Sequence, residues 1–304
     1  MVTKAVGRPI LRGLMIRLCL AVLGLTLALR PVFPQEIDPG DAEYSGLDRE
    51  ESTLSRFSHG FASGFSAWDL SIAFVGLLSA LDSFYSEHHL DFPVLGFDVE
   101  FTDWVARTDG NTSLGTRIDP NRLSWAIIAS QFAATAILDE FTEAGITRTD
   151  YLRIHYFAKA NILNAFVTDL SKSTIYRERP NGFDGRSFFS GHTSDTFVLC
   201  SFLYREAEEW MDACLPGSER RLGRSVAKIG AFGAFYGWAA YVGFSRIYDR
   251  GHYLSDVIVG AAVGTTIGNF MYSRFQAKVR DKGSDSENPE LLLAGTSLVL
   301  YVPL

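Results

Sequence analysis

The sequence predicts an all-α protein that folds as a single six-helix bundle. Apolar residues recur at helical spacing in six blocks, and no proline interrupts any of them. No internal repeat is visible, so the blocks are expected to pack around one core. The expected helices cover residues 61–84, 124–141, 151–171, 191–210, 225–245 and 252–275.

The composition narrows the class of protein further. The chain has 304 residues, of which 47% are apolar and 21% are charged, and this excludes an intrinsically disordered chain or a low-complexity fibre. The formal net charge of −7 argues against a nucleic-acid binder, and three cysteines are too few for a disulfide scaffold. The mean hydropathy of +0.08 is compatible both with a water-soluble protein and with a membrane protein.

The N-terminal segment, residues 1–34, has the pattern of a signal peptide or membrane anchor. Four basic residues precede a short apolar run, Leu18–Leu29. The run is shorter than the ~20 residues that a confident membrane span needs. We therefore expect an exported, periplasmic or membrane-associated protein with its active site outside the cytoplasm. Export would allow a disulfide between Cys200 and Cys214, and two free thiols are the equal alternative.

The remaining segments divide by composition. Residues 35–60 are polar and acidic and are expected to form a linker, while residues 61–275 hold the helical domain. Inside that domain, residues 86–122 contain several prolines and glycines and are expected to form a long loop. Residues 276–304 form a charged tail, in which Ser297–Leu304 could form a strand. Pro303 near its end would limit that strand to the edge of a sheet.

The last two helices raise the question of a membrane. Residues 229–245 and 257–273 are 17 uncharged residues each, and both segments carry glycines at small-xxx-small spacing. The other blocks contain charged residues, which are costly in a bilayer. The balance favours a water-soluble or peripheral bundle. Whether the glycine stripes face lipid or protein stays open at this point.

Three short segments carry residues suited to chemistry: 172–180, 189–192 and 245–256. They fall at the end of the third helix, the start of the fourth, the end of the fifth and the start of the sixth. In an up-and-down bundle with short connections, all four of these ends lie at one end of the molecule. We therefore expect the active site at that end of the bundle.

The residues gathered there suit a tetrahedral oxyanion. Lys172, Arg179 and Arg246 supply positive charge, and arginine can bind phosphate oxygens in pairs. Ser190 and Gly191 open a helix, whose first backbone N–H groups are unpaired and attract anions. These five residues form a candidate anion cradle, and a basic pocket in an acidic protein indicates a small anionic substrate.

Two histidines at the same end can perform acid–base or nucleophilic work. His252 and Asp256 are i and i+4 on one helix, so the carboxylate can orient the ring and leave one nitrogen nucleophilic. His192 has no such partner, which suits a proton donor to a leaving oxygen. The spacings of a metal site are missing from the sequence, and we expect neither a metal nor another cofactor.

The three segments together resemble the signature of the type 2 phosphatidic acid phosphatase superfamily. That pattern is Lys-x6-Arg-Pro, then Pro-Ser-Gly-His, then Ser-Arg-x5-His-x3-Asp, and the sequence departs from it only at Phe189, where proline is usual. Proline would stiffen the turn into the helix, whereas Phe189 could line the pocket instead. The resemblance covers about residues 151–275, and three linked motifs make it specific.

The resemblance implies a metal-independent phosphomonoesterase that works through a phosphohistidine. His252 would be the nucleophile, Asp256 would orient it, and His192 would protonate the leaving group and then activate water. The anion cradle would hold the phosphoryl oxygens. The expected partner is a phosphate ester, such as a lipid phosphate, an isoprenoid pyrophosphate or a soluble ester, with membrane association in the lipid case and no nucleic acid.

Other activities share this anion site. A vanadate-dependent haloperoxidase uses the same cradle, although such enzymes are usually much longer, and a lipid phosphotransferase would pass the phosphoryl group to an alcohol. A non-enzymatic membrane protein is disfavoured by the intact histidines and acid. Four charged residues near the motifs lie outside the signature and are expected mainly as surface charge: Arg177, Arg186, Asp195 and Arg250.

Overall fold

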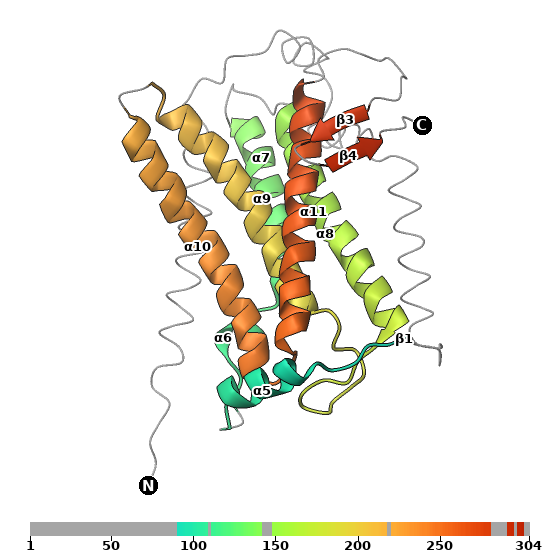
Figure 1. Cartoon of the computed structure of the whole chain (residues 1–304). Coiled ribbons are helices and arrows are strands. Elements are labelled where there is room, and N and C mark those ends of the chain that lie inside the picture. The colour runs from blue at the N-terminus through green and yellow to red at the C-terminus, as the bar shows by residue number, and fades with distance from the viewer. Residues whose placement is uncertain are drawn as a thin grey trace.

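The computed structural model describes residues 90–108, 111–141, 148–217, 220–280, 291–294 and 297–300. Five long helices run up and down through this part of the chain (Figure 1). They are α7 (Pro120–Phe141), α8 (Arg148–Thr174), α9 (Gly191–Cys214), α10 (Arg221–Tyr248) and α11 (Leu254–Arg280). The all-α prediction is confirmed. The helix expected at 61–84, the linker and the export segment lie outside the described residues.

Two short helices occupy the region that we expected to be a loop. They are α5 (Gly96–Val105) and α6 (Leu114–Arg117), so the loop prediction for 86–122 is wrong there. The reason is an inverted pattern in α5, which buries the polar side chains of Asp98 and Thr102 and leaves Trp104 80% exposed. A search for an apolar face cannot find such a helix.

The strands are few and short. β1 (Leu90–Asp91) pairs in parallel with β2 (Ile175–Tyr176), which ties the segment before α5 to the segment after α8. β3 (Leu291–Ala294) and β4 (Ser297–Leu300) form an antiparallel pair. The tail therefore contains the expected strand, paired within a hairpin.

The core lies between α8, α9 and α11, with α7 beside it. Phe157 of α8 stacks on Phe202 of α9 at 4.8 Å between ring centroids, and Tyr272 of α11 meets Phe202 edge-on at 5.1 Å. All three rings are fully buried. Such aromatic pairs contribute about 0.5–1.5 kcal/mol each beyond their buried area. Phe157 and Tyr272 lie in the halves of α8 and α11 that are remote from the site, and Phe202 lies near the middle of α9, so the cluster holds these helices together above the site.

The glycine stripe of α11 faces α9. A Cβ atom on Gly264 would lie 2.2 Å from the carbonyl oxygen of Ser194, and one on Gly260 would lie 2.7 Å from that of Ser190. The two backbones therefore touch, which only glycine permits. On α10, by contrast, a Cβ on Gly233 or Gly237 would meet no atom within 4 Å, so this stripe points away from the described part of the molecule.

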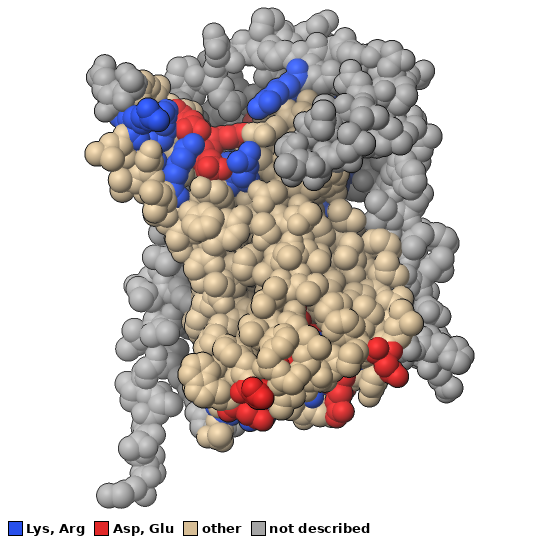
Figure 2. Space-filling model, in the orientation of Figure 1, with Lys and Arg blue, Asp and Glu red and all other residues tan. Residues whose placement is uncertain are grey.

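The surface is charged at its two ends and uncharged between them. Figure 2 shows Lys, Arg, Asp and Glu gathered at the two ends of one face, with a broad uncharged band between them. Helix α10 exposes large apolar side chains along its length, among them Leu222, Ile229 and Phe232. Within the described residues, α11 is the one helix that is long and apolar enough to cross a membrane.

The two cysteines of the domain are not joined. Cys200 and Cys214 are both free, and both lie on α9. A helix rises about 1.5 Å per residue, so their separation of 14 positions corresponds to roughly 21 Å, far beyond the reach of a disulfide. The disulfide alternative was wrong because both cysteines belong to one continuous helix.

Candidate active site

The structure brings the three sequence motifs together at one end of the bundle. Lys172 lies near the end of α8, and Gly191 and His192 begin α9. Arg246 lies near the end of α10, and His252 follows it in the short turn before α11. These helix ends lie together at the lower end of the molecule in Figure 1.

His252 is held with one ring nitrogen available. Its Nδ1 lies 2.7 Å from the backbone carbonyl oxygen of Ser187, and its Nε2 lies 3.3 Å from Nη1 of Arg179. A carbonyl oxygen can only accept a hydrogen bond, so Nδ1 carries the proton and Nε2 presents its lone pair. The ring is 2% exposed, which keeps this orientation fixed.

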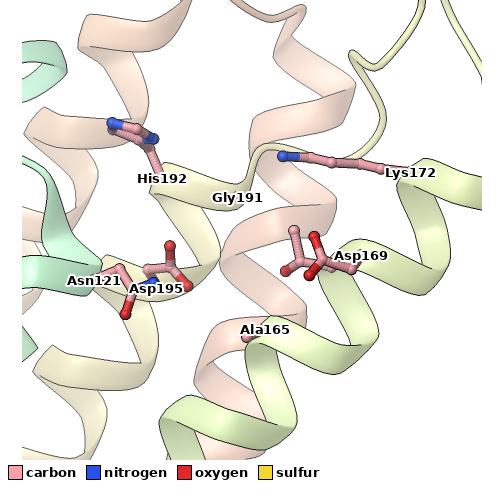
Figure 3. Close-up of a pocket in the computed structure, with 8 residues that line it drawn as sticks. Asn121, Ala165, Asp169, Lys172, Gly191, His192 and Asp195 are labelled. Atoms are coloured by element: carbon pink, nitrogen blue, oxygen red, sulfur yellow. The ribbon is translucent and has the colours of Figure 1, made fainter. Parts of the chain in front are cut away.

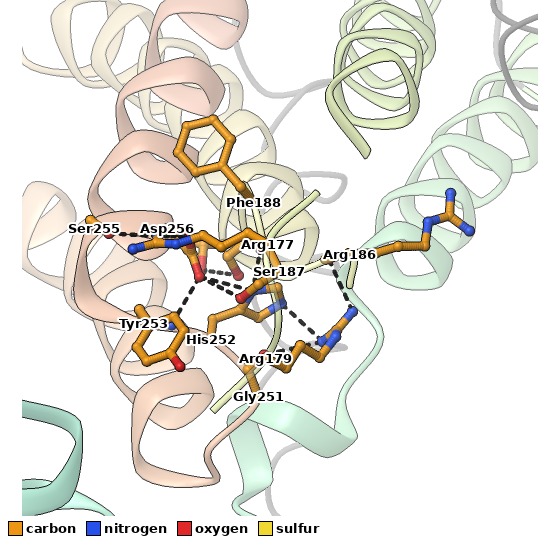
Figure 4. A network of polar contacts seen from close by, with 12 residues as sticks. Arg177, Arg179, Arg186, Ser187, Phe188, Gly251, His252, Tyr253, Ser255 and Asp256 are labelled. Carbon is orange, nitrogen blue, oxygen red and sulfur yellow. Dashed lines mark hydrogen bonds and ion pairs between the residues drawn. The ribbon is translucent and has the colours of Figure 1, made fainter. Parts of the chain in front are cut away.

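Asp256 contacts His252 less directly than we expected. Its Oδ2 lies 3.8 Å from His252 Nδ1, beyond hydrogen-bond distance. The same oxygen accepts hydrogen bonds from the Ser187 hydroxyl at 2.6 Å and from the Tyr253 N–H at 2.9 Å. Ser187 therefore connects the two groups, because its hydroxyl binds the carboxylate while its carbonyl binds the ring (Figure 4).

Arg177 is the largest departure from the sequence prediction. We expected a surface charge, but its side chain is fully buried and forms ion pairs with Asp98, at 2.6 Å, and with Asp256. It also donates to Ser255 Oγ at 2.8 Å, and the rings of Phe92 and Tyr253 lie on it at 5.2 and 4.9 Å. Its location was unpredictable because Asp98 is remote in sequence and the segment around it was expected to be a loop.

The other charged residues outside the signature have mixed positions. Arg250 pairs with Asp103 at the surface, at 3.0 Å. Arg186 accepts a hydrogen bond from Arg179 through its carbonyl oxygen, at 3.4 Å. Asp195 lines a cavity next to the anion cradle, described below.

The members of the anion cradle lie around His252. A Cβ on Gly191 would lie 3.1 Å from Nζ of Lys172, and one on Gly251 would lie 2.9 Å from Nη2 of Arg246. Nη1 of Arg179 donates to the Gly251 carbonyl at 3.2 Å. Within the described part of the chain, no carboxylate lies within 4 Å of the charged groups of Lys172 or Arg246. Two cations without a close counter-ion form a site for an anion.

The start of α9 adds backbone donors to this site. Ser190 is fully buried at the N-cap position, and its side chain makes no capping hydrogen bond to the first turn. Its hydroxyl instead accepts from Thr193 at 2.8 Å. The first N–H groups of α9 are therefore left for a ligand. Phe189 is 3% exposed and contacts the Phe188 ring, so it packs inside the protein and does not line the cavity.

Burial and neighbouring cations shift the titration of the site. Burial, assisted by Arg246, lowers the pKa of His192 to about 4, and burial also lowers the pKa of His252 to about 4. Burial and Arg179 lower the pKa of Lys172. Both rings are therefore neutral at pH 7. A phosphate dianion would favour the protonated form of His192, because an opposite charge raises the pKa of a histidine.

A cavity of about 180 Å³ opens beside Lys172, Gly191 and His192 (Figure 3). Side chains outside the signature complete its wall: Asn121 from the start of α7, Asp169 from α8 and Asp195 from α9. Asn164 donates a hydrogen bond to Oδ1 of Asp195 at 2.6 Å. The site therefore consists of a cationic anion cradle with a polar cavity next to it.

Comparison with known proteins agrees with this geometry. Residues 154–280 match the family model of the PAP2 superfamily. A lipid A 1-phosphatase from Porphyromonas gingivalis is 33% identical over 106 residues, which are 35% of this chain and 20% of that protein. The match thus spans about a fifth of the length of this relative. No solved structure matches the chain.

Proposed function

We propose that the chain, whose residues 154–280 match the family model of the PAP2 superfamily, hydrolyses phosphate monoesters through a phosphohistidine, with a lipid-linked phosphate as substrate. One observation carries the proposal: the unprotonated Nε2 of His252 lies 3.3 Å from Nη1 of Arg179, in a site where Lys172 and Arg246 have no carboxylate within 4 Å in the described part of the chain. A nucleophile beside an anion site is what phosphoryl transfer requires.

In the first step, Nε2 of His252 attacks phosphorus, and the bond between phosphorus and the leaving oxygen breaks. His192 gives its proton to that oxygen. The imidazole becomes positively charged, and the Ser187 carbonyl, bonded to Nδ1 at 2.7 Å, stabilises this charge. Asp256, 3.8 Å away, adds a negative charge to the same environment. In the second step, His192 takes a proton from water, the water oxygen bonds to phosphorus, and His252 is released.

The anion cradle stabilises the transition state. In this proposal Lys172, Arg179 and Arg246 bind the non-bridging oxygens, together with the first N–H groups of α9. Preorganised charges and donors of this kind usually supply the largest part of the rate enhancement. Because the cations are fixed in a largely buried site, they need no reorganisation when charge develops on the phosphoryl oxygens.

The lipid part of the proposal has separate support. Large apolar side chains are exposed along α10, and α11 has the length and composition of a membrane span. One face of the protein has an uncharged band between two charged ends, which suits a protein surrounded by lipid (Figure 2). In this proposal the protein lies in closer contact with the membrane than the water-soluble or peripheral bundle that the sequence favoured. The relative from Porphyromonas gingivalis is a lipid A 1-phosphatase, which supports a lipid-linked substrate. Placement of the site outside the cytoplasm depends on the export segment predicted at residues 1–34.

The test is an assay of the purified full chain with p-nitrophenyl phosphate. We expect turnover that persists in EDTA and is inhibited by vanadate. His252→Ala should abolish it, while Arg205→Ala, which alters a surface ion pair with Glu208, should leave it unchanged. Trapping of a phosphorylated protein with the wild type and not with His252→Ala would identify the intermediate. Unchanged turnover in His252→Ala would refute the proposal.

A further inference from the structure

The cavity beside the anion cradle lies on one particular side of the reaction. In-line phosphoryl transfer places the nucleophile and the leaving group on opposite sides of phosphorus. His192, the proposed proton donor to the leaving oxygen, lines the cavity, whereas His252 is not among its described lining residues. The cavity is thus adjacent to the leaving-group side of the phosphate.

The wall of the cavity is polar. Asp169 and Asp195 contribute carboxylates, Asn121 contributes an amide, and Ala165 is the one apolar residue among the described lining residues. Such a wall is a poor environment for an acyl chain, because burying carboxylates against hydrocarbon is unfavourable. Carboxylates also repel a second phosphate. They favour a group that donates hydrogen bonds.

Asp195 is held with one oxygen available. Asn164 is itself fully buried and donates to Oδ1 of Asp195, which fixes the carboxylate. Among the residues that the structure describes, none donates a hydrogen bond to Oδ2. A hydroxyl of a bound leaving group could therefore bind Oδ2 without displacing an existing protein contact.

The size of the cavity limits the group further. Its volume of about 180 Å³ is well above the ~10–15 Å³ that a single water needs on the same measure, so it admits a group of several non-hydrogen atoms. This room suits a glycerol-sized polyol, or part of a sugar ring whose remainder extends out of the opening. A long chain attached to such a group would have to leave the cavity toward the surface.

Building on the proposed function, we infer that this cavity is a leaving-group subsite for a polyol, whose hydroxyls lie next to the phosphate ester and donate to Asp195 and Asp169. The class of substrate is then a phosphate ester of a polyhydroxylated group, as opposed to a phosphate attached directly to an alkyl chain. On cleavage, the released hydroxyl oxygen takes its proton from His192 at the mouth of the cavity.

The test compares two dianionic esters with three carbons each, glycerol 1-phosphate and propyl phosphate, with p-nitrophenyl phosphate as a reference. For the wild type, kcat/KM should be about tenfold or more higher for glycerol 1-phosphate than for propyl phosphate. Asp195→Asn and Asp169→Ala should each reduce this ratio severalfold, because each variant removes an acceptor for the hydroxyls of glycerol 1-phosphate and no contact to propyl phosphate. Asp103→Asn, which changes an exposed carboxylate outside the cavity, should keep the ratio.

Each outcome decides between the two proposals. Equal kcat/KM for the two three-carbon esters in the wild type, or an equal loss for both in the aspartate variants, would overturn the subsite and leave the phosphatase intact. Absence of turnover with all three esters would instead refute the proposed function. If Asp195→Asn fails to fold, the wild-type comparison and Asp169→Ala still decide.

Discussion

Replacement of Arg177 by methionine tests the buried ionic network directly. The change leaves Asp98 and Asp256 without their shared guanidinium, and all three side chains are fully buried. Removal of one partner of a buried ion pair costs about 3–5 kcal/mol, and here two carboxylates lose their counter-ion. A domain of 150–250 residues loses roughly 2–4 °C in Tm per kcal/mol, so the expected fall is roughly 6–20 °C.

The assay is thermal unfolding of the purified chain, followed by intrinsic tryptophan fluorescence. Arg205→Met is the matched control, because Arg205 forms an ion pair with Glu208 at a partly exposed position, and such pairs contribute ~0–1 kcal/mol. The double variant Arg177→Met with Asp98→Asn should recover part of the loss, since one buried carboxylate is removed. Equal shifts for Arg177→Met and Arg205→Met would refute the reasoning.

Three further predictions concern pH, packing and charge. Burial lowers the pKa of His192 and His252 from the ordinary 6.5 to about 4. Between these two pH values the unfolded chain binds more protons than the folded protein. The free energy of unfolding should therefore fall as the pH decreases from about 6.5 to 4. A flat profile of Tm against pH would contradict this. Gly264→Ala should destabilise the folded protein by about 1–3 kcal/mol, because the new Cβ would lie 2.2 Å from an α9 carbonyl oxygen. Gly237→Ala should stabilise it by up to ~1 kcal/mol, because no atom lies within 4 Å of the new Cβ and alanine favours a helix. Equal Tm values for the two variants would contradict the observed packing. Lys172→Met should weaken vanadate inhibition about tenfold or more, because it removes a positive charge from the anion site. It should also raise the Tm, because burial lowers the pKa of Lys172 and the charged lysine has no close carboxylate in the described part of the chain. Unchanged inhibition would show that Lys172 does not belong to the anion site.

The sequence was sufficient to predict the long helices and where their ends meet. Continuous apolar spacing, without proline, identified α7 to α11 within a few residues of their observed bounds. The convergence of the helix ends that carry Lys172, His192, Arg246 and His252 then required only an up-and-down order of the helices. These inferences succeed because each depends on local pattern and on helix order alone.

The supporting contacts could not be predicted in this way. Asp98 meets Arg177 across 79 positions, and it does so from a helix whose polar side is the buried one. Ser187 acts through its backbone carbonyl as well as its hydroxyl, and a carbonyl leaves no trace in the sequence. The i and i+4 spacing of His252 and Asp256 placed them on one helical face, but the competing carbonyl decided the hydrogen bond.

The contact of α9 with α11 has a mechanical consequence. The backbone of α11 at Gly260 touches the Ser190 carbonyl, and the Ser190 N–H donates to the Asp256 carbonyl at 3.2 Å. His192, in the first turn of α9, and His252, two residues before α11, are therefore carried by two helices whose main chains are in direct contact near the site. The main-chain contact between α9 and α11 therefore fixes the distance between the proton donor His192 and the nucleophile His252. We therefore expect the distance between proton donor and nucleophile to stay constant while a substrate enters through the opening of the cavity.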